Sequence, residues 1–236
     1  MSTRVDDTFR EWTDGLDDGQ SIISIFDHIR DIPYSLSVPM TDPVTAPEQI
    51  LIIGKGYCAP KHYLLAEMYR RLGYDVAYAT FPFLWNDPDL AYPPELRRLA
   101  SALPVAYHLA CRVRIGSRRV LVDATWDPPL ARGGFPVNIR WDGHSDTLCA
   151  VKPLRSAVRT AFCRTATSEP FRKSDEKELL ACDGEEDHAD AEARERYFRH
   201  RAGKRTQEEI QRILRFNQEF DAWLDNLRRP PCNKDP

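Results

Sequence analysis

Two β-rich runs joined by a tight turn constrain the possible folds of this chain most strongly. The runs YHLACRVRI and RRVLVDATW flank Gly116-Ser117, a dipeptide typical of a two-residue hairpin loop. The sequence therefore predicts an antiparallel hairpin in which Ile115 pairs with Arg118. Further strands are predicted at DVAYATFPF (75–83), GGFPVNIRW (133–141) and TLCAVKPL (147–154).

The register of this hairpin brings a histidine close to an aspartate. His108 would lie opposite Thr125 and Asp123 opposite Ala110, so His108 and Asp123 become diagonal neighbours on one face of the sheet. Their Cα atoms are then expected about 7–8 Å apart, a gap that two side chains can bridge. A slip of one residue would put them on opposite faces. The sequence thus predicts a His–Asp pair.

A cysteine at the start of a helix supplies a third candidate. In GKGYCAPKHYLLAEMYRRLGY (54–74), Cys58 stands where a glycine-bearing segment becomes an amphipathic helix, and Pro60 falls in the first turn, where proline is tolerated. A neighbouring imidazolium and a helix N-terminus both lower the pKa of a thiol. Unpaired N–H groups of the first turn suit a developing oxyanion. Cys58, His108 and Asp123 are therefore the candidate catalytic residues.

These segments resemble the transglutaminase-like superfamily, papain-like thiol enzymes with Cys, His and Asp in that chain order. The resemblance covers roughly residues 20 to 155, and its most specific part is DATW, which follows a hydrophobic strand with a histidine upstream. It implies Cys58 as nucleophile, His108 as base and Asp123 as the acid that orients the imidazole. A proline-rich insertion, FLWNDPDLAYPPELRR, departs from the family pattern and is expected to form a lid or a substrate wall. No calcium-ligand cluster and no CxxC zinc module accompanies the core.

Four further residues are candidates for substrate binding or for the oxyanion hole. Tyr34 and Tyr57 are expected to line the site or to help hold the oxyanion. Trp126 is expected in the core or in the cleft wall. His62 lies one helical turn after Cys58 and is expected in the cleft wall, with the role of base as an alternative.

Two other roles for these residues stay open. Cys58 can be a buried structural thiol, and Asp123 can serve only as an acceptor for a backbone donor. Cys58-x3-His62 and His108-x2-Cys111 also have the spacing of zinc ligands. However, residues three apart on a strand point to opposite faces, which disfavours a zinc site. We expect neither a metal nor another cofactor.

Composition limits the class of protein. The 236 residues are 42% apolar and carry a formal net charge of −3, so nothing favours a nucleic-acid partner. No apolar run approaches about 18 residues and no export signal is evident, so we expect no membrane contact. The six cysteines include no CxxC pair, which favours a reduced, cytoplasmic protein.

The expected organisation has three parts. Residues 1–20 are polar and expected to be flexible, residues 21–168 form the catalytic domain, and residues 169–236 form a charged linker and a C-terminal helix. The fold class is α+β: a helical lobe carrying Cys58 packs on an antiparallel sheet carrying the other two candidates. The apolar stripe of the C-terminal helix is expected to pack on the domain or on a partner.

The expected reaction is attack of a thiolate on an amide or thioester carbonyl, followed by transfer of the acyl group to an amine or to water. Its substrate would be a protein, a peptide or a small amide or thioester. Two alternatives remain. One is an acyltransferase that builds amide bonds on a small metabolite. The other is a catalytically idle fold that serves as a protein-binding module through its C-terminal helix.

Overall fold

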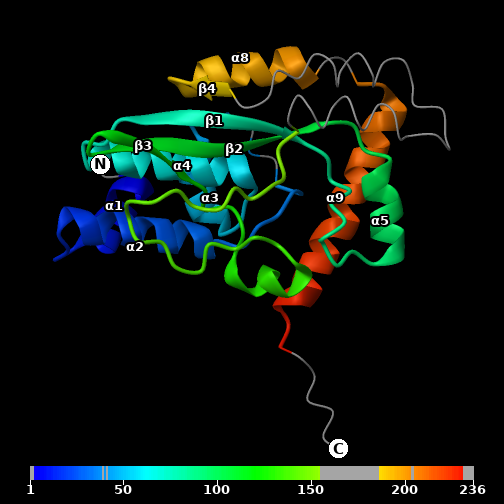
Figure 1. The fold of residues 1–236 in the computed structure, drawn as a ribbon, viewed down its shortest axis with the longest axis horizontal. Helices are drawn as coiled ribbons and strands as arrows, with labels where there is room; N and C mark the ends of the chain where they lie inside the picture. The colour runs from blue at the N-terminus through cyan, green and yellow to red at the C-terminus, as the bar shows by residue number, and fades with distance from the viewer. Residues whose placement is uncertain (1–2, 39, 41, 155–185, 203–204, 231–236) are drawn as a thin grey trace, which may run out of the picture.

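The computed structural model describes residues 3–38, 40, 42–154, 186–202 and 205–230. They form an α+β fold around a four-stranded antiparallel sheet, in which the strands follow the order β3-β2-β1-β4 (Figure 1). The strands are β1 (Val76–Phe83), β2 (Ala106–Ile115), β3 (Arg118–Val122) and β4 (Glu186–His188).

The hairpin predicted from Gly116-Ser117 is confirmed. Ile115 pairs with Arg118, and the ladder continues in the same register to Cys111 opposite Val122. Gly116 adopts a φ of 59°, which only glycine takes without strain, so the turn needs this residue.

The predicted strands at 133–141 and 147–154 are wrong, because both segments follow an irregular path after the 3-10 helix η1 (Pro128–Gly133). Prolines in both segments remove ladder donors. Segment 147–154 is instead tied to the end of β3, where the Thr147 backbone N–H donates to the Leu121 carbonyl at 2.9 Å. The sheet therefore ends at β3 and leaves Asp123 at the edge of an irregular segment.

Helix α4 (Cys58–Arg71) packs against β2 and β1 and forms the centre of the core (Figure 1). Helices α2 (Asp18–Asp31) and α3 (Ala46–Ile53) pack against α4. Eleven of the fourteen residues of α4 are buried, which exceeds the single apolar face that its sequence suggests. The helix that carries Cys58 is thus the most enclosed helix of the described chain.

The N-terminal segment contains a helix, where residues 1–20 were expected to be flexible. Helix α1 (Arg4–Thr13) begins with a capping box, in which Thr3 and Asp6 satisfy each other's backbone donors. The Glu48 carboxylate accepts from two N–H groups at the start of α1, and Val5 is buried. These contacts fix the segment on α3.

The C-terminal helix packs back on the domain. Helix α9 (Gln207–Arg228) lies against α5 (Pro94–Ser101) and η1. It buries Phe216, Phe220, Trp223 and Leu224. A partner contact through this helix remains a prediction and would use its outer face.

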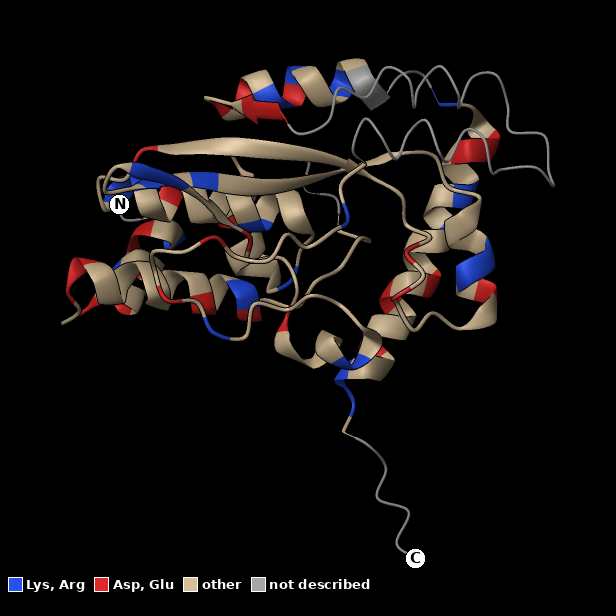
Figure 2. Ribbon diagram, viewed as in Figure 1, with Lys and Arg blue, Asp and Glu red and all other residues tan. Residues whose placement is uncertain are grey.

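The charge-dense region expected to be a solvated linker includes an ordered piece. Helix α8 (Ala191–Ala202) follows β4 along the β1 edge of the sheet (Figure 1). Figure 2 shows both signs of charge along α8. Arg194 nevertheless lies buried against the domain, with 4% of its surface exposed. None of the helices in the described ranges is long and apolar enough to cross a membrane.

Candidate functional site

Cys58 is held in place by the segment that precedes its helix. Gly56 forms a parallel bridge with Tyr34 and exchanges backbone hydrogen bonds with Pro33 and Ser35 at 3.0 and 3.1 Å. A Cβ atom at Gly56 would meet the Ile50 side chain at 2.8 Å, so a larger residue there would force the side chains around it to shift. Cys58 is consequently fixed at the first position of α4.

The start of α4 is open. Tyr57 occupies the N-cap position and no side chain caps the helix. Pro60 has no N–H group, and the Lys61 N–H is bonded to the Tyr57 carbonyl at 3.3 Å. The backbone N–H groups of Cys58 and Ala59 are therefore the two first-turn donors available to an anion beside the thiol.

His108 contacts Asp123 as the hairpin register predicts. The His108 Nε2 and the Asp123 Oδ2 lie 2.8 Å apart, and both side chains are buried. The same ring lies close enough to the Cys58 thiol for each group to shift the pKa of the other, and its Nδ1 is the ring nitrogen that Asp123 does not engage. One imidazole thus lies near both a carboxylate and a sulfur at a helix N-terminus.

Asp123 is held by three further donors. Its Oδ1 accepts from the Thr125 hydroxyl at 2.6 Å and from the Thr125 backbone N–H at 3.2 Å. Its Oδ2 accepts from the Ala150 backbone N–H at 2.7 Å. Burial raises the pKa of Asp123, but the charge of His108 and these hydrogen bonds outweigh it and hold the pKa well below its usual range. The carboxylate is therefore ionised, and hydrogen bonds engage both of its oxygens.

The thiol and the imidazole shift each other's pKa values. Burial alone would raise the pKa of Cys58, but the hydrogen bond with His108, its charge and the Leu109 backbone N–H together lower it. Burial alone would lower the pKa of His108, yet the Asp123 charge and the bonds to Asp123 and Cys58 raise it to about 10. Both shifts favour a thiolate–imidazolium pair.

His62 lies behind this group and does not line the cavity. Its Nδ1 contacts the Cys58 carbonyl at 2.8 Å, while its Nε2 accepts from the Ala124 backbone N–H at 3.1 Å. Burial lowers the pKa of His62 to about 4, so the ring is neutral. With both nitrogens bonded inside the core, His62 has none left for a substrate or a metal ion.

The predicted alternative zinc ligands do not converge in the described chain. Cys111 is fully buried, its sulfur donates to the His62 carbonyl at 3.5 Å, and burial raises its pKa. Among the described residues, His108, Asp123 and Cys149 are close enough to hold a metal ion, with their possible ligand atoms within 4.8 Å of one another. The atoms of His108 and Asp123 that could coordinate a metal ion already take part in hydrogen bonds, which disfavours a metal site here.

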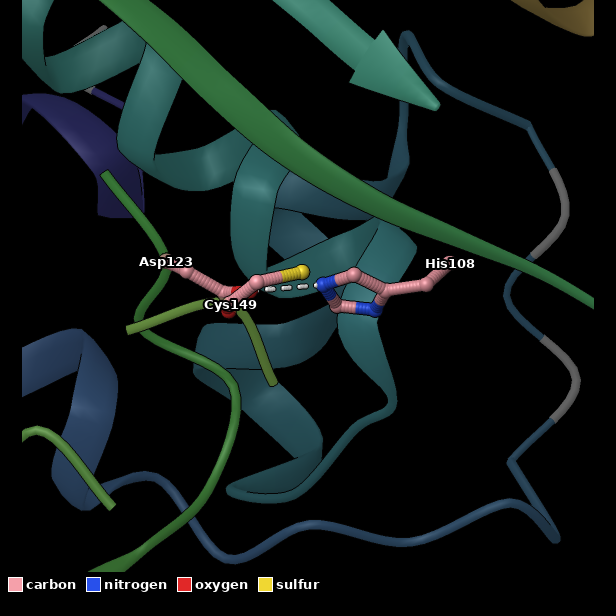
Figure 3. A group of neighbouring side chains, drawn as sticks. All are labelled: His108, Asp123 and Cys149. Carbon is pink, nitrogen blue, oxygen red and sulfur yellow. Dashed lines mark hydrogen bonds and ion pairs between the residues drawn. The ribbon is translucent and has the colours of Figure 1, made fainter. Parts of the chain in front are cut away.

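Cys149 is a neighbour of the site that the sequence did not reveal. Figure 3 shows its sulfur beside the His108 ring, on the side that faces the Asp123 carboxylate. It comes from the irregular segment after β3, which was expected to be a strand. Contact between Cys149 and the site follows from that irregular path, for which the sequence gives no signal.

A cavity of about 920 Å³ opens onto this group. Cys58 and His108 line it, together with the predicted Tyr34, Tyr57 and Trp126. The Tyr57 hydroxyl donates to the Met40 carbonyl, and the Trp126 Nε1 donates to the Ala150 carbonyl at 2.8 Å. Because those donors are bonded within the protein, these two side chains contribute walls. Trp85, from the proline-rich insertion, forms another part of the wall.

Two buried basic residues beside the site were not predicted. The Lys61 Nζ donates to the carbonyls of Arg30, Ile32 and Thr125 at 2.7–3.0 Å. Arg194, from α8, lines the cavity and is close enough to Cys58 to lower the pKa of its thiol. Each is a residue type that normally stays in solvent, so the sequence offered no reason to bury it.

Comparison with known proteins identifies no family for the chain. No family model matches it, and no curated protein matches it. A search of solved structures found a protein of Cytophaga hutchinsonii provisionally described as a cysteine protease. That structure is 18% identical, with a TM-score of 0.37, over 54% of this chain. The match spans 38% of the Cytophaga protein, well under half of its length.

Proposed function

We propose that this protein is a cysteine-dependent acyl-transfer enzyme that acts on an amide or thioester carbonyl. The observation that carries the proposal is the imidazole of His108, which is bonded to Asp123 and lines the same cavity as Cys58, close enough to lower the pKa of that thiol. The chain order Cys, His, Asp and the helix-start position of the thiol support a transglutaminase-like or papain-like arrangement. The adjoining cavity supplies room for a substrate.

The first half of the reaction forms a thioester with the enzyme. The Cys58 thiolate attacks the substrate carbonyl, and the C=O electron pair moves onto oxygen. The backbone N–H groups of Cys58 and Ala59 stabilise that oxyanion. As the tetrahedral intermediate collapses, the imidazolium of His108 donates its proton to the departing amine or thiol. Asp123 keeps the ring oriented and stabilises its charged form.

The second half releases the acyl group. Neutral His108 accepts a proton from water or from an acceptor amine, which attacks the thioester carbonyl. The C–S bond then breaks and Cys58 leaves as a thiolate beside a recharged imidazolium. Water gives hydrolysis, whereas an amine gives a new amide bond. The same residues serve both outcomes, so the acceptor determines the reaction class.

The experiment is to mix the protein with small acyl thioesters and to follow its intact mass in the first seconds. We expect a transient acyl adduct that maps to Cys58 and is absent in Cys58→Ala. Addition of a primary amine then tests whether the acyl group passes to nitrogen faster than to water. A folded wild-type protein that forms no adduct with any thioester or activated amide would instead favour the catalytically idle binding module.

A further inference from the structure

The cavity contains a buried cation that the proposed chemistry does not use. Arg194 is 4% exposed and lines the same cavity as Cys58. Its guanidinium stacks over the Phe198 ring at 5.0 Å from the centroid. Its Nη1 pairs with Glu195 at 2.6 Å and contacts the Tyr63 hydroxyl at 3.5 Å.

The pairing of Arg194 is incomplete. Its Nε is buried without a hydrogen-bond partner in the described chain. Glu195 shares its Oε1 between the Arg194 Nη1 and the Tyr63 hydroxyl, which donates to it at 2.5 Å. A guanidinium has five N–H donors arranged in a fork that suits a planar carboxylate. A buried donor without a partner is costly, so an arginine in this state has capacity for an anion.

The spare hydrogen-bonding capacity of Arg194 lies close to the proposed nucleophile. Arg194 acts electrostatically on both Cys58 and Tyr57, which lie at the start of α4. The other arginines of α8 that line the cavity, Arg196 and Arg199, are exposed and screened by solvent. Among the side chains of α8 that the structure describes, Arg194 is the cavity arginine with low exposure, and it stands within electrostatic range of the thiol.

We infer that Arg194 binds a carboxylate of the substrate close to the carbonyl that Cys58 attacks. The substrate class is thus an acyl donor that carries a negative charge near its reactive carbonyl, such as an acidic peptide or a dicarboxylic monoamide. This inference rests on the proposed thiol chemistry, since it concerns the same cavity. It assigns Arg194 a role in specificity and leaves proton transfer to His108.

Two alkylating agents of matched size test this inference without a known substrate. Iodoacetate carries a carboxylate and iodoacetamide is its neutral counterpart, and both react with a thiolate by displacement of iodide. The ratio of their rates at Cys58 cancels the thiolate fraction, which is common to both. We expect the iodoacetate-to-iodoacetamide ratio to exceed that of N-acetylcysteine by about tenfold, and Arg194→Gln to return it to that reference.

Matched variants separate a local contact from the general field. Arg194→Lys keeps the charge but not the fork, and should retain part of the preference. Arg196→Gln removes the same charge from the same helix at an exposed position, where Glu192 is its ion-pair partner at 3.5 Å. That variant should leave the ratio within about twofold of the wild-type value, because exposed charges are screened.

If Arg194→Gln does not fold, the wild-type protein still provides a test. Succinate should protect Cys58 from iodoacetamide at concentrations about tenfold lower than succinamide does. If the iodoacetate-to-iodoacetamide ratio at Cys58 equals that of N-acetylcysteine and succinate gives no selective protection, the carboxylate site is wrong. The proposed role of Cys58 as nucleophile would still stand. Failure of both agents to label Cys58 in the folded protein would instead overturn the proposed function itself.

Discussion

At the scale of single residues, Asp123 connects the site to the surrounding fold. Its two oxygens accept from His108, from the hydroxyl and N–H of Thr125 and from the Ala150 N–H. A carboxylate satisfies all these donors because it is an acceptor only. An amide offers one acceptor oxygen and presents N–H groups on the other side. On the proposed mechanism, Asp123 therefore serves catalysis as well as local order.

Asp123→Asn should reduce turnover by roughly 10³–10⁴-fold, because the imidazole loses its preferred tautomer and its charge stabilisation. It should also lower the free energy of unfolding by about 1–3 kcal/mol, since one of the donors that now bond to the carboxylate would face an amide N–H. Turnover per folded molecule and urea unfolding are the two measurements. Thr125→Val is the control: it removes the hydroxyl donor and should cost stability while it spares most of the activity. Equal activity losses in the two variants would contradict the assigned role.

At the scale of elements, a buried lysine joins the two halves of the site. Lys61 projects from α4, and its three hydrogen bonds end on one carbonyl in the last turn of α2, one just after α2 and one just after β3. The Thr125 carbonyl belongs to the segment that carries Asp123, and Cys58 lies on the first turn of α4. Lys61 therefore fixes the helix that bears the thiol relative to the strand end that bears the carboxylate.

Lys61→Met should lower the free energy of unfolding by about 2–4 kcal/mol, because it leaves three carbonyls without their donor. Chemical denaturation with fluorescence detection measures this change. Lys55→Met alters an exposed lysine just before the same helix and should change stability by less than about 0.5 kcal/mol. Similar values for both variants would show that the buried hydrogen bonds of Lys61 contribute nothing to the core.

At the scale of the whole molecule, α9 belongs to the core and also supports the cavity. Its Asp221 carboxylate accepts from the Ser35 hydroxyl and from the N–H groups of Leu36 and Ser37 at 2.7–3.0 Å. Its Arg228 pairs with Asp127 at 2.8 Å. These contacts hold the segment that follows Tyr34 along one wall of the cavity. We therefore expect the C-terminal helix to unfold together with the rest of the domain.

Phe220→Ala should destabilise the whole domain by about 3–5 kcal/mol, since the ring is fully buried among aromatic neighbours. Leu214→Ala, on the same helix at 50% exposure, should cost less than about 1 kcal/mol. Calorimetry of both variants should show one transition each, shifted down only in the first. A separate low-temperature transition for α9 would mean that it is an independent appendage.

The sequence predicted the parts of the site that depend on local rules. A two-residue turn sets the register of the hairpin, and that register places the end of β3, just before Asp123, beside the part of β2 that carries His108. The helix that starts at Cys58 follows from its apolar periodicity. Residues that depend on long-range packing were missed. Nothing local distinguishes buried Arg194 from its exposed neighbours on α8, and Cys149 reaches the site along a path without regular structure.

The central claim is that Cys58 is a thiolate paired with His108, and the pH dependence of alkylation tests it most directly. Iodoacetamide labelling of each cysteine is followed by mass spectrometry from pH 6 to pH 8 in the wild type and in His108→Ala. An ordinary thiol, with a pKa of about 8.5, slows roughly tenfold per pH unit over this range. Cys58 should instead lose much less of its rate between pH 8 and pH 6 than such a thiol does, because His108 lowers its pKa, and His108→Ala should abolish this behaviour. Buried Cys111 should stay unlabelled throughout. A Cys58 that is silent at pH 6, or that labels equally well without His108, would contradict the account.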